Sequence, residues 1–277
     1  MIRALGIKKI HVHVYTCYVV IDAIRQEGCK VLSYTLDSNL MPTVEFPKED
    51  FIIYNNYFGC IGNKVKELAA LYPNLIVDNA QAFYSQPDCR AAVYSPRKFF
   101  GLPDGGILRG KDIPMLELNQ GYSFDVTSHL LKRHDYGAQA GYLDFCTNDE
   151  ALEKYTLESM SSLTMALMGN IDYERVRKQR LANFLYLKEH LSTLFSLSMN
   201  TDDVPLVFPF LVDNGDELRA KLIQNEIFCA RYWPNVLCDV DKSSLEYNLT
   251  KNIVAIPLDQ RYGVEDMERI IETINKL

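Results

Sequence analysis

Short apolar segments alternate with helical patterns through the first hundred residues, and this alternation restricts the fold more than any other feature of the sequence. Strands are predicted at residues 9–14, 31–36, 51–54, 75–77, 91–94 and 106–108. Between them, residues 16–26 and 64–71 have helical spacing, with Thr16 as the expected N-cap of the first helix and Gly28 as its end. Strands joined by helices in this order predict an α/β domain with a mostly parallel sheet.

Beyond residue 112 the pattern changes to longer helices and a second set of strands. Helices are predicted at 150–168, 173–194, 215–224 and 264–276, and strands at 206–212, 227–232 and 252–256. Pro209 cannot donate a hydrogen bond, which predicts that it lies in an edge strand or at a bulge. We therefore predict a large α/β domain (1–170), a long linking helix (171–200) and a small C-terminal α+β domain (201–277).

Composition argues against several classes of protein. The chain of 277 residues is 48% hydrophobic with a net charge of -7, and no basic tract interleaves with aromatic residues, so nucleic acid is not an expected partner. No apolar run approaches the roughly 20 residues that span a membrane, and we expect neither a membrane span nor a signal peptide. The seven scattered cysteines, none in C-x-x-C spacing, predict reduced thiols in the cytoplasm. His11 and His13 lack nearby ligand residues in the sequence, so we predict no metal site.

Two residues twenty positions apart carry the chemical information. Asp78 closes the strand 75–77, and Lys98 stands just before a Gly-rich turn at 101–106. In open α/β sheets ligands bind beyond the carboxyl ends of the strands, where Asp78 is expected. Such a pair suits pyridoxal phosphate (PLP): the lysine amine forms a Schiff base with its aldehyde, while the carboxylate keeps its pyridine nitrogen protonated. Gln81, three residues after Asp78, is placed to donate a hydrogen bond to the ring hydroxyl.

Each of these residues also has an ordinary interpretation. An aspartate after a strand commonly caps a turn, and a lysine at a turn commonly extends to solvent. Phe99 and Phe100 favour the chemical interpretation, because apolar neighbours around the Lys98 amine would favour its neutral, nucleophilic form. Asp78, Gln81 and Lys98 in this order at strand ends are stronger evidence than any one of them alone.

At these positions the chain resembles the DegT/StrS-type aminotransferases. Residues 77–83 read VDNAQAF and residues 94–106 read YSPRKFFGLPDGG, similar to the family's D-x-A-Q-A and S-x-x-P-x-K-x-x-G stretches. Looser similarity extends over residues 14–17, 54–59, 172–183 and 256–258, the third of these resembling an R-x-x-N helix. Members of this family are fold-type I PLP enzymes that act mostly on nucleotide-linked keto-sugars in surface-polysaccharide, including lipopolysaccharide, and antibiotic-sugar pathways.

The resemblance implies a structure and an assignment of roles. The fold would have a three-layer large domain and a small C-terminal domain. Lys98 would carry the internal aldimine, Asp78 would pair with the pyridine nitrogen, Gln81 would contact the ring hydroxyl, and Tyr18 or Cys17 would lie against the ring. The family also implies a homodimer with active sites at the subunit interface.

Two departures from the family concern the cofactor phosphate. The chain begins after the Gly/Ser segment that binds the phosphate in family members, and Val93 occupies the position of the family's phosphate-binding serine, which leaves Ser95 as the nearest candidate. Three explanations stay open: a native protein longer than this sequence, a short homologue with phosphate contacts elsewhere, or a homologue that no longer catalyses.

The predicted function is PLP-dependent transfer of an amino group from an amino acid donor to a keto-sugar acceptor. Arg231 and Tyr57 are candidate substrate contacts. The alternative is a non-catalytic dimeric binding or scaffold protein with the same fold. Sugar dehydration is less favoured, because related dehydratases generally replace the lysine with histidine, whereas Lys98 is intact. A nicotinamide dehydrogenase is weaker again, because no G-x-G-x-x-G follows the first strand.

Overall fold

A six-stranded sheet forms the centre of the large domain. The structure, a computed structural model, describes residues 1–152 and 156–277. The strands are β1 (Lys9–His13), β2 (Lys30–Tyr34), β3 (Phe51–Asn55), β4 (Leu75–Asp78), β5 (Ala91–Tyr94) and β6 (Ile107–Gly110), in the spatial order β2-β1-β3-β4-β5-β6. The first five are parallel and β6 is antiparallel to β5, which confirms the predicted α/β class and mostly parallel sheet.

Both faces of this sheet are buried, as expected for parallel strands. Ile10, Ile53 and Ile76 belong to a core on one side that includes Ile2 of α1 (Ile2–Leu5) and Ile24 of α2 (Tyr18–Gln26).

On the other side, Ile52, Leu75 and Val77 pack in a larger core that includes Val65 of α3 (Gly62–Leu71). The sheet therefore lies between two apolar layers, which agrees with the predicted three-layer arrangement.

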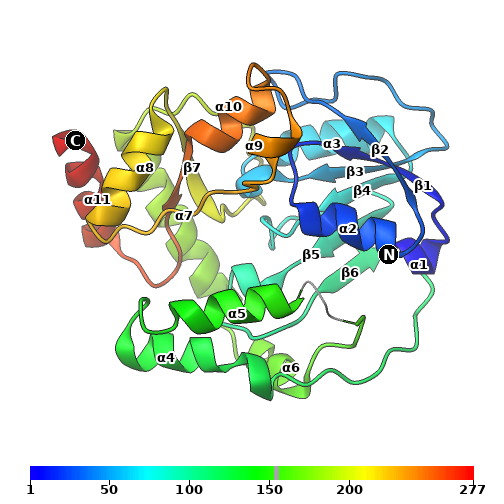
Figure 1. The fold of residues 1–277 in the computed structure, drawn as a ribbon, viewed down its shortest axis with the longest axis horizontal. Helices are drawn as coiled ribbons and strands as arrows, with labels where there is room; N and C mark the ends of the chain where they lie inside the picture. The colour runs from blue at the N-terminus through cyan, green and yellow to red at the C-terminus, as the bar shows by residue number, and fades with distance from the viewer. Residues whose placement is uncertain (153–155) are drawn as a thin grey trace.

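The middle of the chain is mainly helical and lies along the bottom of Figure 1. Its helices are α4 (Ser128–Tyr136), α5 (Tyr142–Leu152), α6 (Ser162–Met168) and α7 (Tyr173–His190), and a short 3-10 turn, η3 (Phe124–Val126), precedes α4. Two more 3-10 turns follow strands of the sheet: η1 (Tyr57–Gly59) after β3 and η2 (Pro96–Lys98) after β5. α7 runs from this region into the C-terminal unit at the upper left.

The predicted continuous helix at 150–168 is wrong. α5 ends at Leu152 and α6 begins only at Ser162, while residues 153–155 of the predicted helix lie outside the described residues. Ser159 instead bridges to Gln120, and the Ser161 side chain caps α6 by accepting the Thr164 N–H at 3.1 Å. A serine competes with the helix interior by making such caps, which is the physical reason for the break.

The C-terminal unit is a two-stranded antiparallel sheet covered by helices. Its elements are β7 (Val207–Leu211), α8 (Gly215–Gln224), α9 (Val236–Asp239), α10 (Leu245–Asn252), β8 (Ile253–Pro257) and α11 (Val264–Lys276). Among the described residues β7 pairs only with β8, so Pro209 does lie in an edge strand. The strand predicted at 227–232 is wrong: only Ala230 bridges to Ala255, because Trp233 turns into the core with a positive φ of 56°.

Two further details of the predicted elements differ. Cys17, not Thr16, is the N-cap of α2, and the buried Thr16 hydroxyl accepts a hydrogen bond from Asn55 at 3.2 Å. One hydrophobic core runs from the sheet into the C-terminal unit, so the division at residues 170 and 200 stays a prediction. Over the ranges 1–152 and 156–277, we find no helix with the length and apolarity that a membrane crossing requires.

Candidate active site

Asp78 ends β4 at the carboxyl edge of the parallel strands. Its Oδ1 accepts the Ala80 N–H at 2.8 Å. Burial raises the pKa of the Asp78 carboxyl, whereas the Lys98 charge and the Ala80 N–H act to lower it. Lys98 is therefore close enough to influence Asp78, and the structure brings together the two residues on which the sequence interpretation depends.

Lys98 ends the η2 turn that follows β5, and its side chain is exposed. The expectation that Phe99 and Phe100 enclose its amine is wrong, because these rings are only 2% and 6% exposed and pack into the core beside Phe83. The two phenylalanines attach the turn to the core by their packing. The Lys98 amine stays accessible to a ligand.

Gln81 is the residue whose surroundings point most directly to a ligand. Its side chain is 3% exposed, and its Oε1 accepts the Phe58 N–H at 2.9 Å. Its Nε2 is buried without an acceptor among the residues that the structure describes. A buried unpaired donor costs about 1–3 kcal/mol. The ring hydroxyl of a bound cofactor would supply the missing acceptor.

A close backbone contact holds Gln81 in place. Gly59 has φ of +69°, and a Cβ added there would lie 2.8 Å from the Gln81 carbonyl oxygen and 2.7 Å from that of Val204. Only glycine accommodates both this conformation and this approach. The turn after β3 therefore fixes the position of Gln81 at the edge of the sheet.

Of the two candidate ring neighbours, Cys17 is the one that the structure places at this site. It is half-buried, and burial raises the pKa of its thiol while the charge of Lys98 lowers it and those of Asp149 and Asp78 raise it. Tyr18, the next residue, is 40% exposed at the start of α2. Its contact with a cofactor ring stays a prediction.

Ser95 lies between β5 and η2, two residues after Val93. Its carbonyl accepts the Lys98 N–H at 3.1 Å, and its half-buried hydroxyl makes no hydrogen bond within the described part of the chain. The hydroxyl is therefore free for a ligand on the same turn that carries Lys98.

Tyr57 does not line a substrate site, so this expectation is wrong. It is completely buried, and its hydroxyl pairs with His13 Nδ1 at 2.8 Å and with the Tyr15 carbonyl at 3.2 Å. Burial lowers the pKa of His13 to about 4, so this histidine is neutral at physiological pH. The tight turn after β3 directs Tyr57 inward, which the sequence pattern does not reveal.

Arg180 stabilises the η2 turn that carries Lys98, which we call the lysine turn. In the sequence, Arg180 stands out only as part of an R-x-x-N resemblance. Its Nη2 donates to the Phe99 carbonyl at 3.3 Å, and Gln260 Nε2 donates to the same oxygen at 2.8 Å. Arg180 Nε also donates to Gln260 Oε1 at 2.9 Å. The guanidinium stacks over the Phe99 ring, 4.6 Å from its centroid.

The sequence contained a sign of this role. Arg180 lies in α7 at helical spacing from Val176, Phe184 and Leu187, all of them buried, so a charged residue interrupts an apolar face. Burial lowers the pKa of Arg180 to about 10, which leaves it charged at neutral pH. A buried charge of this kind requires fixed partners, and its partners here include the carbonyl of the residue that follows Lys98.

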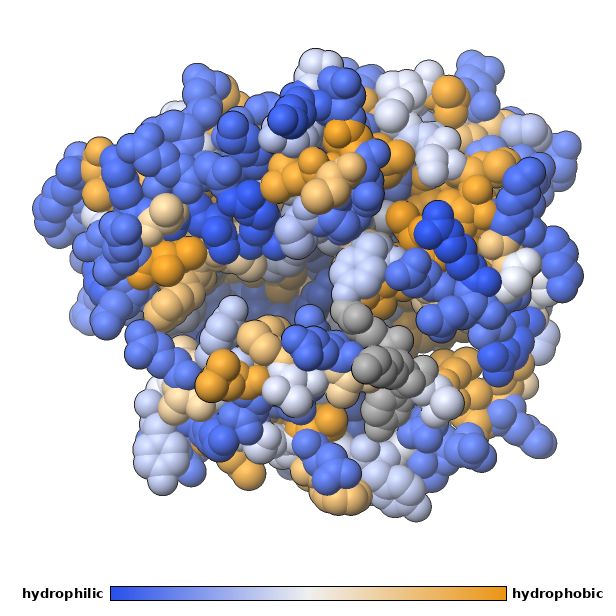
Figure 2. Space-filling model, viewed as in Figure 1, coloured by the Kyte–Doolittle hydropathy of each residue, from blue (hydrophilic) through white to orange (hydrophobic). Residues whose placement is uncertain are grey.

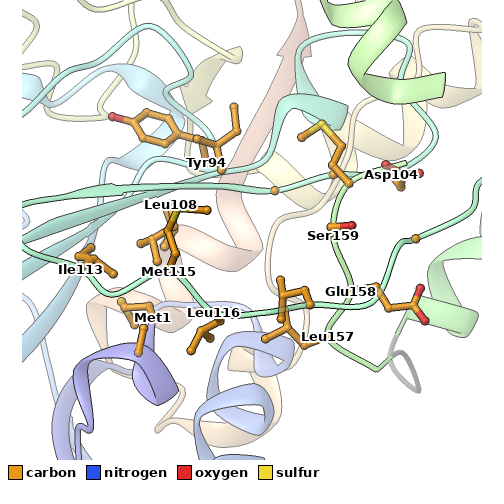
Figure 3. Close-up of a pocket in the computed structure, with 18 of the residues that line it drawn as sticks. Met1, Tyr94, Asp104, Leu108, Ile113, Met115, Leu116, Leu157, Glu158 and Ser159 are labelled. Carbon is orange, nitrogen blue, oxygen red and sulfur yellow. The ribbon is translucent and has the colours of Figure 1, made fainter. Parts of the chain in front are cut away.

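One cavity lies away from these residues. It has a volume of about 680 Å³ and lies between β6 and the segments at 113–122 and 156–160. Figure 3 shows its mainly apolar lining, with Ile113, Leu116 and Leu157 on one side. Neither Lys98 nor Asp78 borders it, so we do not assign the chemistry to this cavity.

The surface is also hollowed between the C-terminal unit and the α4–α5 segment, as Figure 2 shows. The C-terminal unit and the α4–α5 segment both contact residues beside the candidate site. Arg97 Nη2 lies 3.7 Å from Asp149 Oδ1 of α5, and Trp233 of the C-terminal unit packs against Tyr15 with centroids 4.6 Å apart. We call this hollow the central cleft.

Solved structures share this architecture. Spr1654 from Streptococcus pneumoniae, a putative sugar aminotransferase in its PMP form, has a TM-score of 0.65 at 12% identity, covering 99% of this chain and 83% of that chain. DesV from S. venezuelae has a TM-score of 0.65 at 16% identity, covering 99% and 80%. CalS13 from Micromonospora echinospora, a sugar aminotransferase, has a TM-score of 0.56 at 13% identity, covering 97% and 80%.

The chain has the fold of these sugar aminotransferases. At such low identity the likeness concerns the fold alone, and it confirms the fold that the DegT/StrS resemblance implied. No family model and no curated protein matches the sequence. A fold alone does not specify a reaction, so the function depends on the residues of the site.

Proposed function

We propose that this protein is a PLP-dependent aminotransferase that moves an amino group from an amino acid donor to a keto-sugar acceptor, linked to a nucleotide and used in polysaccharide biosynthesis. The observation that carries the proposal is the unused hydrogen-bonding capacity at one sheet edge: the buried Gln81 Nε2, the desolvated Asp78 carboxyl and the accessible Lys98 amine. When bound, PLP supplies an electrophilic aldehyde and an electron-withdrawing ring.

The residues fit a division of roles around that ring. Lys98 Nζ, accessible and close to Asp78, would attach the cofactor and would carry a proton to and from the reacting carbon of the substrate. Asp78 would stabilise a positive charge on the pyridine nitrogen, and that charge would compensate the cost of burying the carboxylate. Gln81 Nε2 would donate to the ring hydroxyl, and the Ser95 hydroxyl would donate to the phosphate.

A homodimer is part of the proposal. Most of the large apolar side chains that are exposed among the described residues lie between residues 108 and 167. Met115, Tyr122, Phe124, Tyr136 and Leu143 are each at least 69% exposed. Such a concentration is unusual on a monomer and typical of a surface that a second copy covers. Because α5 borders the central cleft, this interface would lie beside the active site.

We also place the protein in the cytoplasm. All seven cysteines are free thiols, including the buried Cys29, Cys60 and Cys229. A protein that matures in an oxidising compartment more commonly pairs its cysteines in disulfides.

The test is covalent trapping of the cofactor. Purified protein is saturated with PLP, treated with borohydride and digested, and the peptides are analysed by mass spectrometry. We expect a reduced cofactor adduct on Lys98 that is lost in Lys98→Ala. The matched control, Lys221→Ala, removes a lysine of α8 that pairs with Glu217 and should retain the adduct.

Addition of amino donors then separates transamination from mere binding. A donor such as L-glutamate should convert the bound cofactor to its amine form, followed by absorbance. Absence of any Lys98 adduct at saturating PLP would overturn the proposal. Adduct formation without conversion by any donor would instead favour the non-catalytic dimeric binding protein.

A further inference from the structure

Two arginines, Arg219 and Arg231, lie close together in the C-terminal unit, which borders the central cleft. Asp216 and Arg219 are three residues apart on α8 and so share one face of the helix. Asp216 forms an ion pair with Arg231, and Arg219 Nε donates to the Cys229 carbonyl at 2.9 Å, two residues before Arg231. The two guanidinium groups are thus held together by fixed partners.

The two positive charges of Arg219 and Arg231 exceed the single negative charge of Asp216. Within the described residues, Asp216 pairs with Arg231, whereas the Arg219 hydrogen bond goes to a neutral carbonyl. Burial lowers the pKa of Arg219, and the neighbouring charge of Arg231 lowers it further. Both side chains are only half-buried. One positive charge therefore remains to be compensated at a site that a ligand can reach.

The segment carrying Arg231 is fixed against the strand ends of the large domain. Trp233 packs edge-on against Tyr15, and Asn235 Nδ2 donates to the Thr16 carbonyl at 3.2 Å. Cys17, the next residue after Thr16, lies near Lys98 and Asp78. Arg231 therefore belongs to the same cleft as the candidate catalytic lysine.

Helix α5 provides a measure of the distance between the two ends of this cleft. Tyr142, Cys146 and Asp149 lie at spacings of four and three residues, so they share one helix face. Asp149 contacts Arg97 beside Lys98, while Tyr142 lies near enough to Arg219 for the two to affect each other's pKa. Seven residues of helix correspond to about 10 Å.

We propose that Arg219 and Arg231 form the oxyanion subsite of the acceptor, and that they bind its phosphate or diphosphate while its reacting carbon lies at Lys98. This inference rests on the proposed function and specifies where that substrate is held. The separation along α5 favours an extended phosphorylated acceptor. A dicarboxylic amino donor is the other source of such an oxyanion, but its second carboxylate is only a short two-carbon chain from its reacting carbon.

The first test is calorimetric titration of inorganic pyrophosphate into the protein, with and without PLP. We expect Arg219→Gln to raise the Kd about tenfold, since it removes charge-assisted hydrogen bonds. Asp216→Asn should lower the Kd several-fold, because it removes the carboxylate that competes for Arg231. Lys221→Gln, an equal loss of charge at a lysine of the same helix that is already paired with Glu217, should change the Kd less than about twofold.

Two outcomes would overturn the assignment. One is an equal effect of Arg219→Gln and Lys221→Gln, which would mean that only net charge matters. The other is slower amino transfer from L-glutamate but not from L-alanine in Arg219→Gln, with pyrophosphate binding unchanged, which would assign the pair to the donor. Because pyrophosphate is also titrated without PLP, a failure of the aminotransferase proposal would appear separately, as absence of the Lys98 adduct.

Discussion

At the scale of single residues, the site is defined by groups whose hydrogen-bonding or electrostatic needs the folded chain leaves unmet. Among the described residues, the buried Nε2 donor of Gln81 has no partner, and Asp78 keeps a carboxyl in surroundings that disfavour its charge. Such costs are common at functional sites, because the ligand supplies the compensation. The opposite case is Tyr57, whose hydroxyl is paired with His13 and which is completely buried, so a substrate does not reach it.

The substitution Asp78→Asn tests whether the buried charge of Asp78 costs stability. Burial raises the pKa of Asp78 in the folded protein, so its charge costs stability as the pH rises above the ordinary pKa of an aspartate. The variant should therefore have a higher thermal midpoint than the wild type at pH 7, and the difference should disappear toward pH 3–4, where both side chains are neutral.

The same variant should also hold PLP less tightly, because a neutral amide does not stabilise a charged pyridine nitrogen. Thermal unfolding across the pH range and PLP titration at pH 7 measure the two effects. A variant that is less stable than the wild type at neutral pH, with unchanged PLP affinity, would contradict the role given to Asp78.

At the scale of elements, α7 couples the lysine turn to the C-terminal unit. Arg180 Nη1 donates to the Pro205 and Leu206 carbonyls before β7, while Nη2 reaches the Phe99 carbonyl after η2. Asn183, one turn further along, donates to the Leu258 carbonyl after β8. One helix face thus positions three loops, and one of these loops carries Lys98.

Removal of this contact should affect both stability and the reactivity of Lys98. Arg180→Met should destabilise the protein by about 2–4 kcal/mol, since several buried hydrogen bonds are lost together. Gln260→Leu removes the other donor to the Phe99 carbonyl and should cost less. At a temperature where both variants are fully folded by circular dichroism, PLP adduct formation on Lys98 should be several-fold slower than in the wild type.

The adduct rate distinguishes positioning from general support of the fold. Arg177→Gln is a suitable control, because Arg177 is a half-buried arginine on the same helix whose Nη2 donates to the Thr201 carbonyl at 3.0 Å and not to the lysine turn. The adduct rate in folded Arg180→Met and Gln260→Leu could equal that of this control. That result would show that the contacts of Arg180 and Gln260 with the Phe99 carbonyl have only a structural role.

At the scale of the whole molecule, one segment has an unusually apolar surface. The segment at 108–167 contributes little to the cores of the two sheets and carries most of the exposed apolar side chains of the described residues. A chain with this surface is expected to associate in solution with a second copy.

Sedimentation over a range of concentrations should give a mass about twice the 31.8 kDa of one chain. Phe124→Asp, at a position 77% exposed in η3, should shift the equilibrium toward monomer, because it places a charge in the apolar contact. Leu194→Asp, at a position 67% exposed outside the segment, is the matched control and should leave the dimer intact. Monomeric wild type at all concentrations would refute this prediction.

Much of the architecture could be predicted from the sequence because it depends on local periodicity. Strands buried on both faces appear as short apolar runs, and the boundaries of α8 and α11 were predicted to the residue because caps and helical spacing are local features. The order of Asp78, Gln81 and Lys98 could also be recognised, since consecutive parallel strands bring their carboxyl ends to one edge.

What only the tertiary structure decided is the direction and the partner of each side chain. Phe99 packs inward while Lys98 extends outward, Tyr57 is buried, and a serine cap divides the helix predicted at 150–168. The contact of Arg180 with the Phe99 carbonyl and the Arg219–Arg231 pair join residues from separate elements, so no local pattern reveals them. The sequence thus determined the elements and the chemistry at strand ends, because these follow from neighbours along the chain. Long-range packing decided which groups are buried, paired or left free for a ligand.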